Sequence, residues 1–173
     1  NDKLGITHVH HFYTKRNLLI LSKIYDLIKQ SYLYKALLFS FQASLIRATK
    51  TNRFRFGGTG NLSGTLYLPS LIFERNAISL YKNKTKDQIN MLNLNTDFQK
   101  KVCIFCQSST SLNLLNNIVD YIFTDPPFGS NLMYSELNFL WEAWLKVFTN
   151  NECEAIVNKV QKKGLAEYQE LME

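Results

Sequence analysis

Four residues with clear chemical potential follow one another near the carboxyl end of the chain: Asp125, Pro126, Pro127 and Phe128, directly after an apolar run at 121–123. Two consecutive prolines end a strand or a helix, because proline fixes φ and has no backbone N–H. A carboxylate, a rigid turn and an aromatic ring are therefore presented together where an apolar strand is expected to end. Ligands bind at the carboxyl ends of strands in open α/β sheets, so we predict a ligand site at this turn. The alternative interpretation is a turn that merely terminates a strand.

The elements that must position this turn are predicted from the spacing of apolar residues. Apolar side chains three or four residues apart indicate amphipathic helices, expected at 17–29 after Thr14 as N-cap, 35–49 and 135–148. A polar helix is expected at 74–92. Short apolar runs bounded by polar residues indicate strands, expected at 64–69, 101–107 and 119–125. The last two strands are almost wholly apolar, which is typical of strands covered on both faces. This order of helices and strands predicts an open α/β sheet.

The positive charge of the chain is concentrated in one segment. The formal net charge is +6, and no acidic residue lies between Asp26 and Glu74. Within that segment, residues 50–64 are glycine-rich, basic and without periodicity, so we expect a loop. Basic residues alternate there with Phe54 and Phe56, a pattern that fits contact with a nucleic-acid backbone together with base stacking, or else an ordinary solvated loop. The predicted nucleic-acid-binding residues are Lys50, Arg53, Arg55, Lys15 and Arg16.

The stretch "TDPPFGSN" resembles the catalytic signature of the S-adenosylmethionine-dependent amino-group methyltransferases, which modify adenine N6 or cytosine N4 in DNA. The family pattern is Asp/Asn/Ser-Pro-Pro-Tyr/Phe/Trp, and Asp125 and Phe128 both lie within it. More loosely, "FYTKRNLLILSKIYDLI", "LSGTLYLPSLIFERN" and "SNLMYSELNFLWEAWL" look like the corresponding stretches of bacterial DNA methylases. The resemblance implies that DNA is the partner and S-adenosylmethionine the cofactor, with adenine N6 as the favoured target and a restriction enzyme as a possible second partner.

The resemblance also implies a role for each residue of the motif. The Asp125 carboxylate and the Pro126 carbonyl would accept the two N–H groups of an exocyclic amino group, which directs the nitrogen lone pair at the methyl donor. Pro127 would keep the turn rigid. Phe128 would stack on the base after it leaves the duplex.

The cofactor site is less clearly marked in the sequence. Phe56-Gly57-Gly58-Thr59-Gly60 has the family spacing Phe-x-Gly-x-Gly, but polar, basic residues precede it and a strand rather than a helix is expected after it. We therefore interpret it as a flexible loop that could face DNA, and expect the cofactor loop to lie outside these residues. Ser108, Ser109 and Thr124, at the ends of the two apolar strands, are the predicted cofactor contacts. Relatives tend to carry an aspartate near Ser111, and this chain departs from that pattern.

Together these features predict an α/β fold that forms part of a Rossmann-like methyltransferase sheet flanked by helices. We expect one domain over residues 1–173, an excerpt of a longer methyltransferase. Within it, 30–64 would be a basic helix-and-loop insertion and 101–148 the catalytic strand, motif and helix. The alternatives are a non-catalytic nucleic-acid-binding module, and an amino-group methyltransferase that acts on RNA or on a protein glutamine.

Metal binding and membrane insertion are not expected. Cys103 and Cys106 are three residues apart on a predicted strand, so their sulfurs point to opposite faces. His8, His10 and His11 lack a nearby cysteine or carboxylate cluster, and we predict no metal site. Three cysteines cannot all be paired, which favours a reducing compartment. With no long apolar run and no signal-peptide pattern, we predict a cytoplasmic protein.

Overall fold

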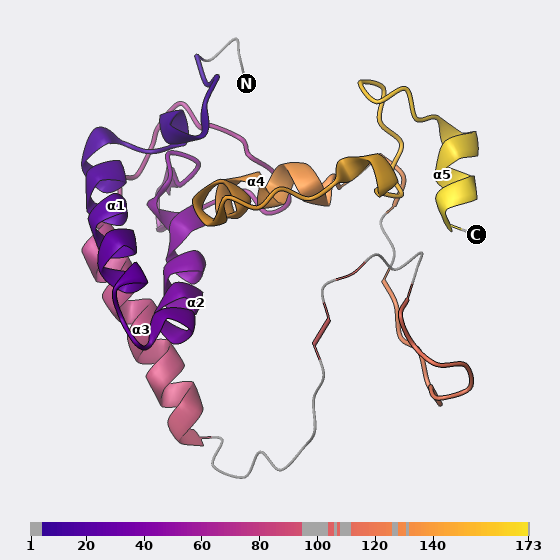
Figure 1. Ribbon diagram of the computed structural model, residues 1–173. Helices are drawn as coiled ribbons and strands as arrows, with labels where there is room; N and C mark the ends of the chain where they lie inside the picture. The colour runs from indigo at the N-terminus through magenta and orange to yellow at the C-terminus, as the bar shows by residue number, and fades with distance from the viewer. Residues whose placement is uncertain are drawn as a thin grey trace. The chain divides into compact units, whose positions relative to one another are not determined.

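The computed structural model describes residues 5–94, 104–105, 107, 112–125, 128–130 and 132–172. These residues form helices and one small antiparallel sheet (Figure 1), which gives the described chain a mixed α and β character. Two compact units are present: unit 1 comprises Asn1–Phe98 and Leu140–Val147, and unit 2 comprises Gln99–Phe139 and Phe148–Glu173.

The first long helix, α1 (Lys15–Lys29), confirms the helix predicted at 17–29. It begins where the hydroxyl of Thr14 accepts a hydrogen bond from the backbone N–H of Asn17 at 3.2 Å, the usual way in which an N-cap satisfies a free donor. Leu21 and Ile28, two turns apart, are both buried. A short 3-10 helix, η2 (Val9–Phe12), precedes α1 and buries Phe12.

The second and third helices were also predicted, with different ends. Helix α2 (Tyr34–Leu45) continues into the 3-10 turn η3 (Ile46–Ala48), and α3 spans Ala77–Leu94. Before α3, the side-chain oxygen of Asn76 accepts a hydrogen bond from Ser79 N at 3.1 Å, and the helix begins there rather than at the predicted residue 74. In unit 1, α1, α2 and α3 each contact the other two.

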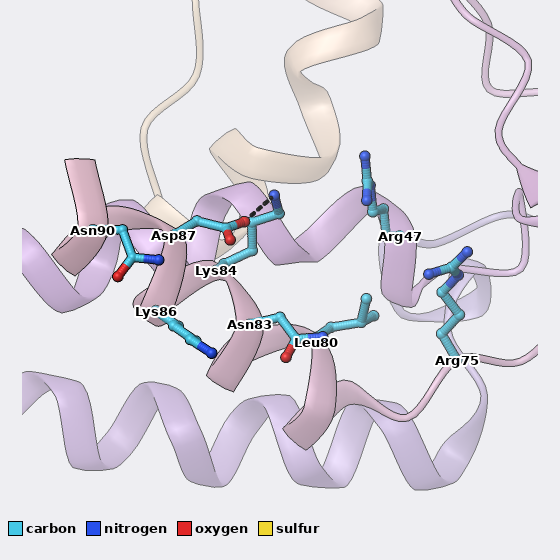
Figure 2. A pocket seen from close by; sticks show the side chains of 8 residues that line it. All are labelled: Arg47, Arg75, Leu80, Asn83, Lys84, Lys86, Asp87 and Asn90. Atoms are coloured by element: carbon cyan, nitrogen blue, oxygen red, sulfur yellow. Dashed lines mark hydrogen bonds and ion pairs between the residues drawn. The ribbon is translucent and has the colours of Figure 1, made fainter.

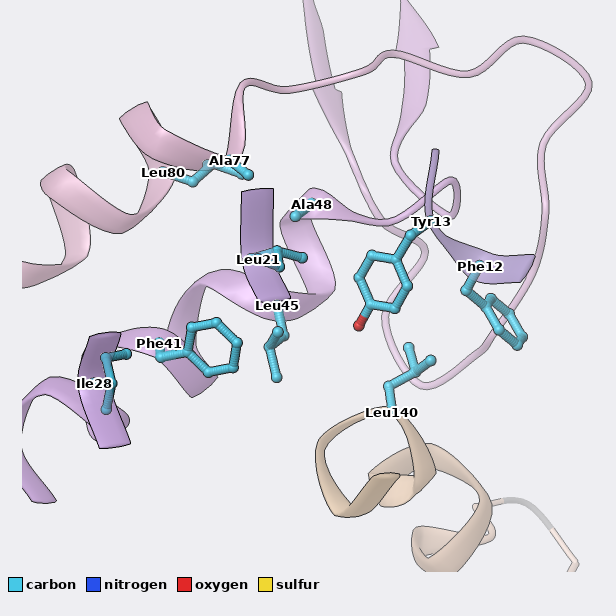
Figure 3. Packing of buried hydrophobic residues seen from close by; sticks show 10 residues of the cluster. All are labelled: Phe12, Tyr13, Leu21, Ile28, Phe41, Leu45, Ala48, Ala77, Leu80 and Leu140. Carbon is cyan, nitrogen blue, oxygen red and sulfur yellow. The ribbon is translucent and has the colours of Figure 1, made fainter. Parts of the chain in front are cut away.

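The core of unit 1 fills the space between these helices (Figure 3). Helix α4 (Tyr134–Leu145) contributes Leu140, which is fully buried, and the rings of Trp141 and Trp144, which pack against the cluster. Trp141 and Trp144 therefore belong to the core of unit 1. The predicted extension to residue 148 is wrong: Lys146 has φ of 57°, which ends the helix, and Phe148 is exposed.

The loop predicted at 50–64 is in fact a β-hairpin. Strand β1 (Arg53–Arg55) pairs antiparallel with β2 (Gly58–Gly60), and Phe56 and Gly57 form the two-residue turn. Gly57 has φ of 86°, a conformation that glycine adopts without strain, so the glycines that indicated a loop make a tight hairpin instead.

The strand predicted at 64–69 is absent. The backbone that meets the hairpin lies further along the chain: Phe54 N donates to Leu71 O at 3.0 Å, and Arg53 forms an isolated bridge with Ile72. Pro69 lacks an N–H for a ladder, which agrees with a partner that begins after it.

The two apolar strands predicted in unit 2 are not seen among the described residues. Most of the run at 101–107 lies outside them, and Ile104 and Phe105 are exposed and outside any strand. Residues 119–125 are also exposed and belong to no strand of the structure. The only sheet in the described part of the chain is β1–β2, so a Rossmann-like sheet is not seen.

Within the described residues, no helix combines the length and the apolar character needed to cross a bilayer.

Candidate functional site

The predicted catalytic motif lies in unit 2, and its two described members are both exposed. Phe128 has 71% of its surface accessible, and the Asp125 side chain makes no hydrogen bond or ion pair with any other described residue. Pro126 and Pro127 lie outside the described residues. The carboxylate and the ring are thus available to a ligand, as a substrate-binding motif requires.

Of the predicted cofactor contacts, only Thr124 can be placed. It is exposed and directly precedes Asp125 in the chain. Ser108 and Ser109 lie outside the described residues, and so does Ser111.

The chain that follows the motif is held by hydrogen bonds within unit 2. Gly129, with φ of 51°, accepts a hydrogen bond at its carbonyl from Val157 N at 3.2 Å. Further along, the Glu154 carboxylate accepts from Ser135 N at 3.1 Å and from Ser135 Oγ at 2.5 Å, and so occupies the N-terminal end of α4. A carboxylate there satisfies free backbone donors and interacts favourably with the helix dipole.

Lys163 holds the backbone of residues 151–154 in place through hydrogen bonds. The ammonium group of Lys163 donates to the backbone carbonyls of Asn151, Glu152 and Glu154 at 3.1, 2.5 and 3.0 Å. Sequence reasoning missed both Glu154 and Lys163, since each acts on residues at least nine positions away. Their role is to fix the backbone downstream of the motif.

Unit 1 carries the positive charge of the protein. Residues 5–94 contain 13 lysines and arginines but only three acidic residues, Asp26, Glu74 and Asp87. Each of these three carboxylates lies within 3.0 Å of a basic nitrogen, from Lys29, Arg16 and Lys84 respectively. Most of the cationic side chains are therefore left for an external anion.

The predicted nucleic-acid-binding residues fall into two groups. At the start of α1, Lys15 is exposed, while Arg16 pairs with Glu74 at 2.9 Å. Hydrogen bonds from the Thr14 hydroxyl and from Arg16 lower the pKa of Glu74. Arg16 thus has a structural partner, although 74% of its side chain remains accessible.

The second group lies on and beside the hairpin. Arg53 and Arg55 are both on β1, Arg55 exposed and Arg53 half-buried with an unpartnered Nε. Lys50 is half-buried just before the hairpin, where its backbone N–H donates to Phe12 O at 2.7 Å. The structure therefore concentrates three of the five predicted residues in one short segment.

The hairpin tip is the most distinctive exposed feature of unit 1. Phe56 is 99% exposed and Phe54 is 45% exposed, with their ring centroids 5.7 Å apart and nearly perpendicular. The base of the hairpin is held by Arg75, which donates to the Thr59 hydroxyl, and by the backbone bond of Phe54. An exposed aromatic ring on a fixed basic hairpin can stack on a base or wedge between bases. The Phe-x-Gly-x-Gly residues form this hairpin and not the strand–loop–helix arrangement of a cofactor loop.

A basic pocket of about 490 Å³ lies elsewhere in unit 1 (Figure 2). Helix α3 runs along it, and Arg47 of η3 and Arg75 lie at one end. It is lined by Arg47, Arg75, Leu80, Asn83, Lys84, Lys86, Asp87 and Asn90. Of the residues that line it, Lys84 and Lys86 lie in the segment 74–92, which the sequence predicts only as a polar helix.

The histidines near the amino end pack against one another. The rings of His10 and His11 are 4.3 Å apart between centroids, and His8 lies 5.4 and 5.3 Å from them. Desolvation, and then the neighbouring His10 and His8, lower the pKa of His11. Across the described residues, no group of three or more His, Cys, Asp or Glu side chains is arranged to hold a metal ion.

In comparisons with models of protein families, with curated proteins and with solved structures, no match to this chain was found.

Proposed function

We propose that this protein is an S-adenosylmethionine-dependent DNA methyltransferase of the amino-group class, with adenine N6 as the favoured target. One observation carries the proposal: Asp125 and Phe128 flank the two prolines of the motif, and both side chains are exposed. A buried Asp125 would have been incompatible with this role. The basic surface of unit 1 supports DNA as the partner.

The residues of the motif would act mainly by position. The Asp125 carboxylate accepts one N–H of the exocyclic amino group and the Pro126 carbonyl accepts the other, which draws the nitrogen lone pair out of conjugation with the ring. Phe128 stacks on the flipped base and holds its plane. As the N–C bond forms and the sulfur–methyl bond of the donor breaks, with a neutral thioether as the leaving group, the nitrogen would acquire positive charge beside Asp125, so the carboxylate would be most stabilising in the transition state. The proton lost afterwards passes to Asp125 or to water.

The cofactor supplies an electrophilic methyl group, and Thr124 is the described residue best placed to contact it. Its exposed hydroxyl beside Asp125 fits such a contact, with Ser108 and Ser109 as the further proposed contacts. The glycine-rich hairpin does not fit the cofactor, because a fully exposed Phe56 and no following helix make a poor cradle.

The proposal includes a Rossmann-like sheet within a single domain. In it, 119–125 is a strand of the catalytic segment 101–148, and 30–64 is a basic insertion. The support is the exposure of the apolar run: Tyr121, Ile122 and Phe123 are 80%, 73% and 83% accessible, an arrangement that favours covering by further structure. A cytoplasmic location and a restriction enzyme as partner belong to the same proposal.

Transfer of a labelled methyl group by the purified full-length protein tests this function. Duplex DNA, RNA and protein substrates are offered in parallel, and incorporation into DNA at adenine N6 is expected. Asp125→Ala should abolish it while the far-ultraviolet circular dichroism spectrum stays unchanged. Asp120→Ala, which removes another exposed carboxylate five positions earlier, is the matched control and should retain activity. Full activity of Asp125→Ala would refute the assignment, and incorporation into RNA or protein alone would redirect it to those substrates.

A second candidate function is a nucleic-acid-binding module without catalysis. The hairpin with its exposed Phe56 favours it, because base stacking and backbone contact need no cofactor. In that case the protein would bind DNA with a strong salt dependence, and calorimetry would detect no S-adenosylmethionine binding.

A further inference from the structure

The pocket between η3 and α3 has a surplus of positive charge that no carboxylate of the described residues neutralises (Figure 2). Its lining contains four basic side chains and one carboxylate, Asp87. Asp87 is already paired with Lys84 at 3.0 Å. Arg47, Arg75 and Lys86 therefore have no carboxylate partner among the described residues. Three cations that share a pocket repel one another, and an anion in the pocket relieves that repulsion.

Arg75 is held in place before any ligand arrives. Its guanidinium donates to the Thr59 hydroxyl and lies 6.0 Å from the Phe73 ring centroid, and its carbonyl accepts from the buried Asn17 side chain at 2.8 Å. The Nε of Arg75 is buried and has no hydrogen-bond partner in the described chain. Fixed guanidinium groups match the oxygens of a phosphate well, and less side-chain entropy is lost when they bind.

The uncharged residues of the pocket also favour a phosphate ester over a simple anion. Asn83 and Asn90 carry amide groups that make no hydrogen bond to other described residues. Leu80 is 7% exposed and provides an apolar contact. A volume of about 490 Å³ lies in the range of small-ligand sites.

We propose that this pocket binds a phosphate group of the nucleic-acid backbone. The inference rests on the proposed nucleic-acid binding by unit 1 and names one of its contacts. The bond from Arg75 to Thr59 joins the pocket to the hairpin that carries Phe56 at its tip, so the phosphate contact and the aromatic contact are mechanically connected. Contacts to phosphates set the register of a protein on a duplex, and the pocket fixes where Phe56 meets the bases.

Fluorescence anisotropy with a labelled DNA duplex tests the pocket across a range of salt concentrations. Arg47→Ala and Lys86→Ala remove side chains without a described partner, so the fold should persist in both. Each should weaken binding by roughly tenfold at low salt and reduce the slope of log affinity against log salt by about 0.9. Lys82→Ala is the matched control, because Lys82 is exposed on the same helix but does not line the pocket, and it should change both quantities much less.

Three outcomes would overturn the proposal: equal losses for Arg47→Ala and Lys82→Ala, unchanged DNA affinity in both pocket variants, or no DNA binding by the unaltered protein. Calorimetry with inorganic phosphate separates the two sources of the ligand. Phosphate binding that depends on Arg47, without any effect on DNA affinity, would identify a free-anion site and exclude the backbone contact. A protein that binds DNA through the pocket but transfers no methyl group would refute the proposed enzymatic function and leave the pocket assignment standing.

Discussion

Unit 1 and unit 2 contain similar apolar side chains, but unit 1 buries many of them in a core, whereas most of those described in unit 2 are exposed. In unit 1 ten hydrophobic residues are buried around α1, α2 and α3 (Figure 3). In unit 2 the buried residues among those described are Ile156 and Asn158 alone. Amphipathic helices find partners close along the chain, whereas a fully apolar strand needs backbone from distant segments on both edges. Stability is thus concentrated in unit 1, while the proposed chemical motif lies in unit 2.

The largest effect is expected from truncation of the aromatic centre of unit 1. Phe41 is fully buried, with its ring 5.3 Å from Trp144 and 5.4 Å from Tyr25. Phe41→Ala should lower the free energy of unfolding by about 3 to 5 kcal/mol, since it leaves a cavity. Both tryptophans of the chain lie in the segment Leu140–Val147 of unit 1, so tryptophan fluorescence in a urea titration reports this unit. The control is Phe39→Ala on the same helix, which is 58% exposed and should cost much less.

A somewhat smaller effect is expected from the ionisation of Tyr13. Burial raises its pKa to about 12, against an ordinary value of 10.0, while its hydroxyl accepts a hydrogen bond from Trp144 Nε1 at 3.1 Å. The pKa of Tyr13 is higher in the folded protein than in the unfolded chain. The contribution of the un-ionised Tyr13 to the free energy of unfolding is therefore complete below pH 10 and is lost as the pH rises towards 12. At about 1.4 kcal/mol per pH unit, the loss approaches about 3 kcal/mol.

Tyr13→Phe isolates this contribution. It should cost about 1 kcal/mol at pH 7 through the lost hydrogen bond, and the variant should then lose less stability than the unaltered protein between pH 10 and 12. Urea titrations followed by tryptophan fluorescence at several pH values measure both. Identical alkaline losses in the two proteins would show that Tyr13 ionises as easily in the folded state as in the unfolded chain.

The smallest effect is expected in the apolar run of unit 2. Ile122 is 73% exposed, and Ile122→Thr should change the free energy of unfolding of unit 1 by less than about 0.5 kcal/mol. Tryptophan fluorescence in a urea titration measures this, because both tryptophans lie in unit 1. A destabilisation comparable to that of Phe41→Ala would mean that the run is packed against the core. It would contradict the conclusion that stability is concentrated in unit 1.

Helices were the predictable part of this molecule, because the information for them is local. The Thr14 cap and the apolar spacing of α1 lie within one stretch of sequence, and α1 begins two residues from its predicted start. The hairpin was missed because Gly57 and Gly58 are compatible with many kinds of turn. In addition, the segment that hydrogen-bonds to the outer side of β1, at Leu71, is 17 positions from Phe54. The candidate site shows the same dependence on distance along the chain. Asp125 and Phe128 could be predicted from a short motif of residue types. The hydrogen bonds from Arg75 to Thr59 and from Ser135 to Glu154 could not, because they join separate segments.

The central claim is that unit 1 binds the nucleic acid and that the Asp125 carboxylate of unit 2 promotes the chemical step. Single-turnover methyl transfer at saturating DNA separates these roles, because a pure loss of affinity disappears at saturation. Asp125→Asn should lower the rate by on the order of 100-fold or more with DNA affinity unchanged, whereas Arg47→Ala should lower affinity and leave the saturated rate intact. An unchanged saturated rate for Asp125→Asn would contradict the account.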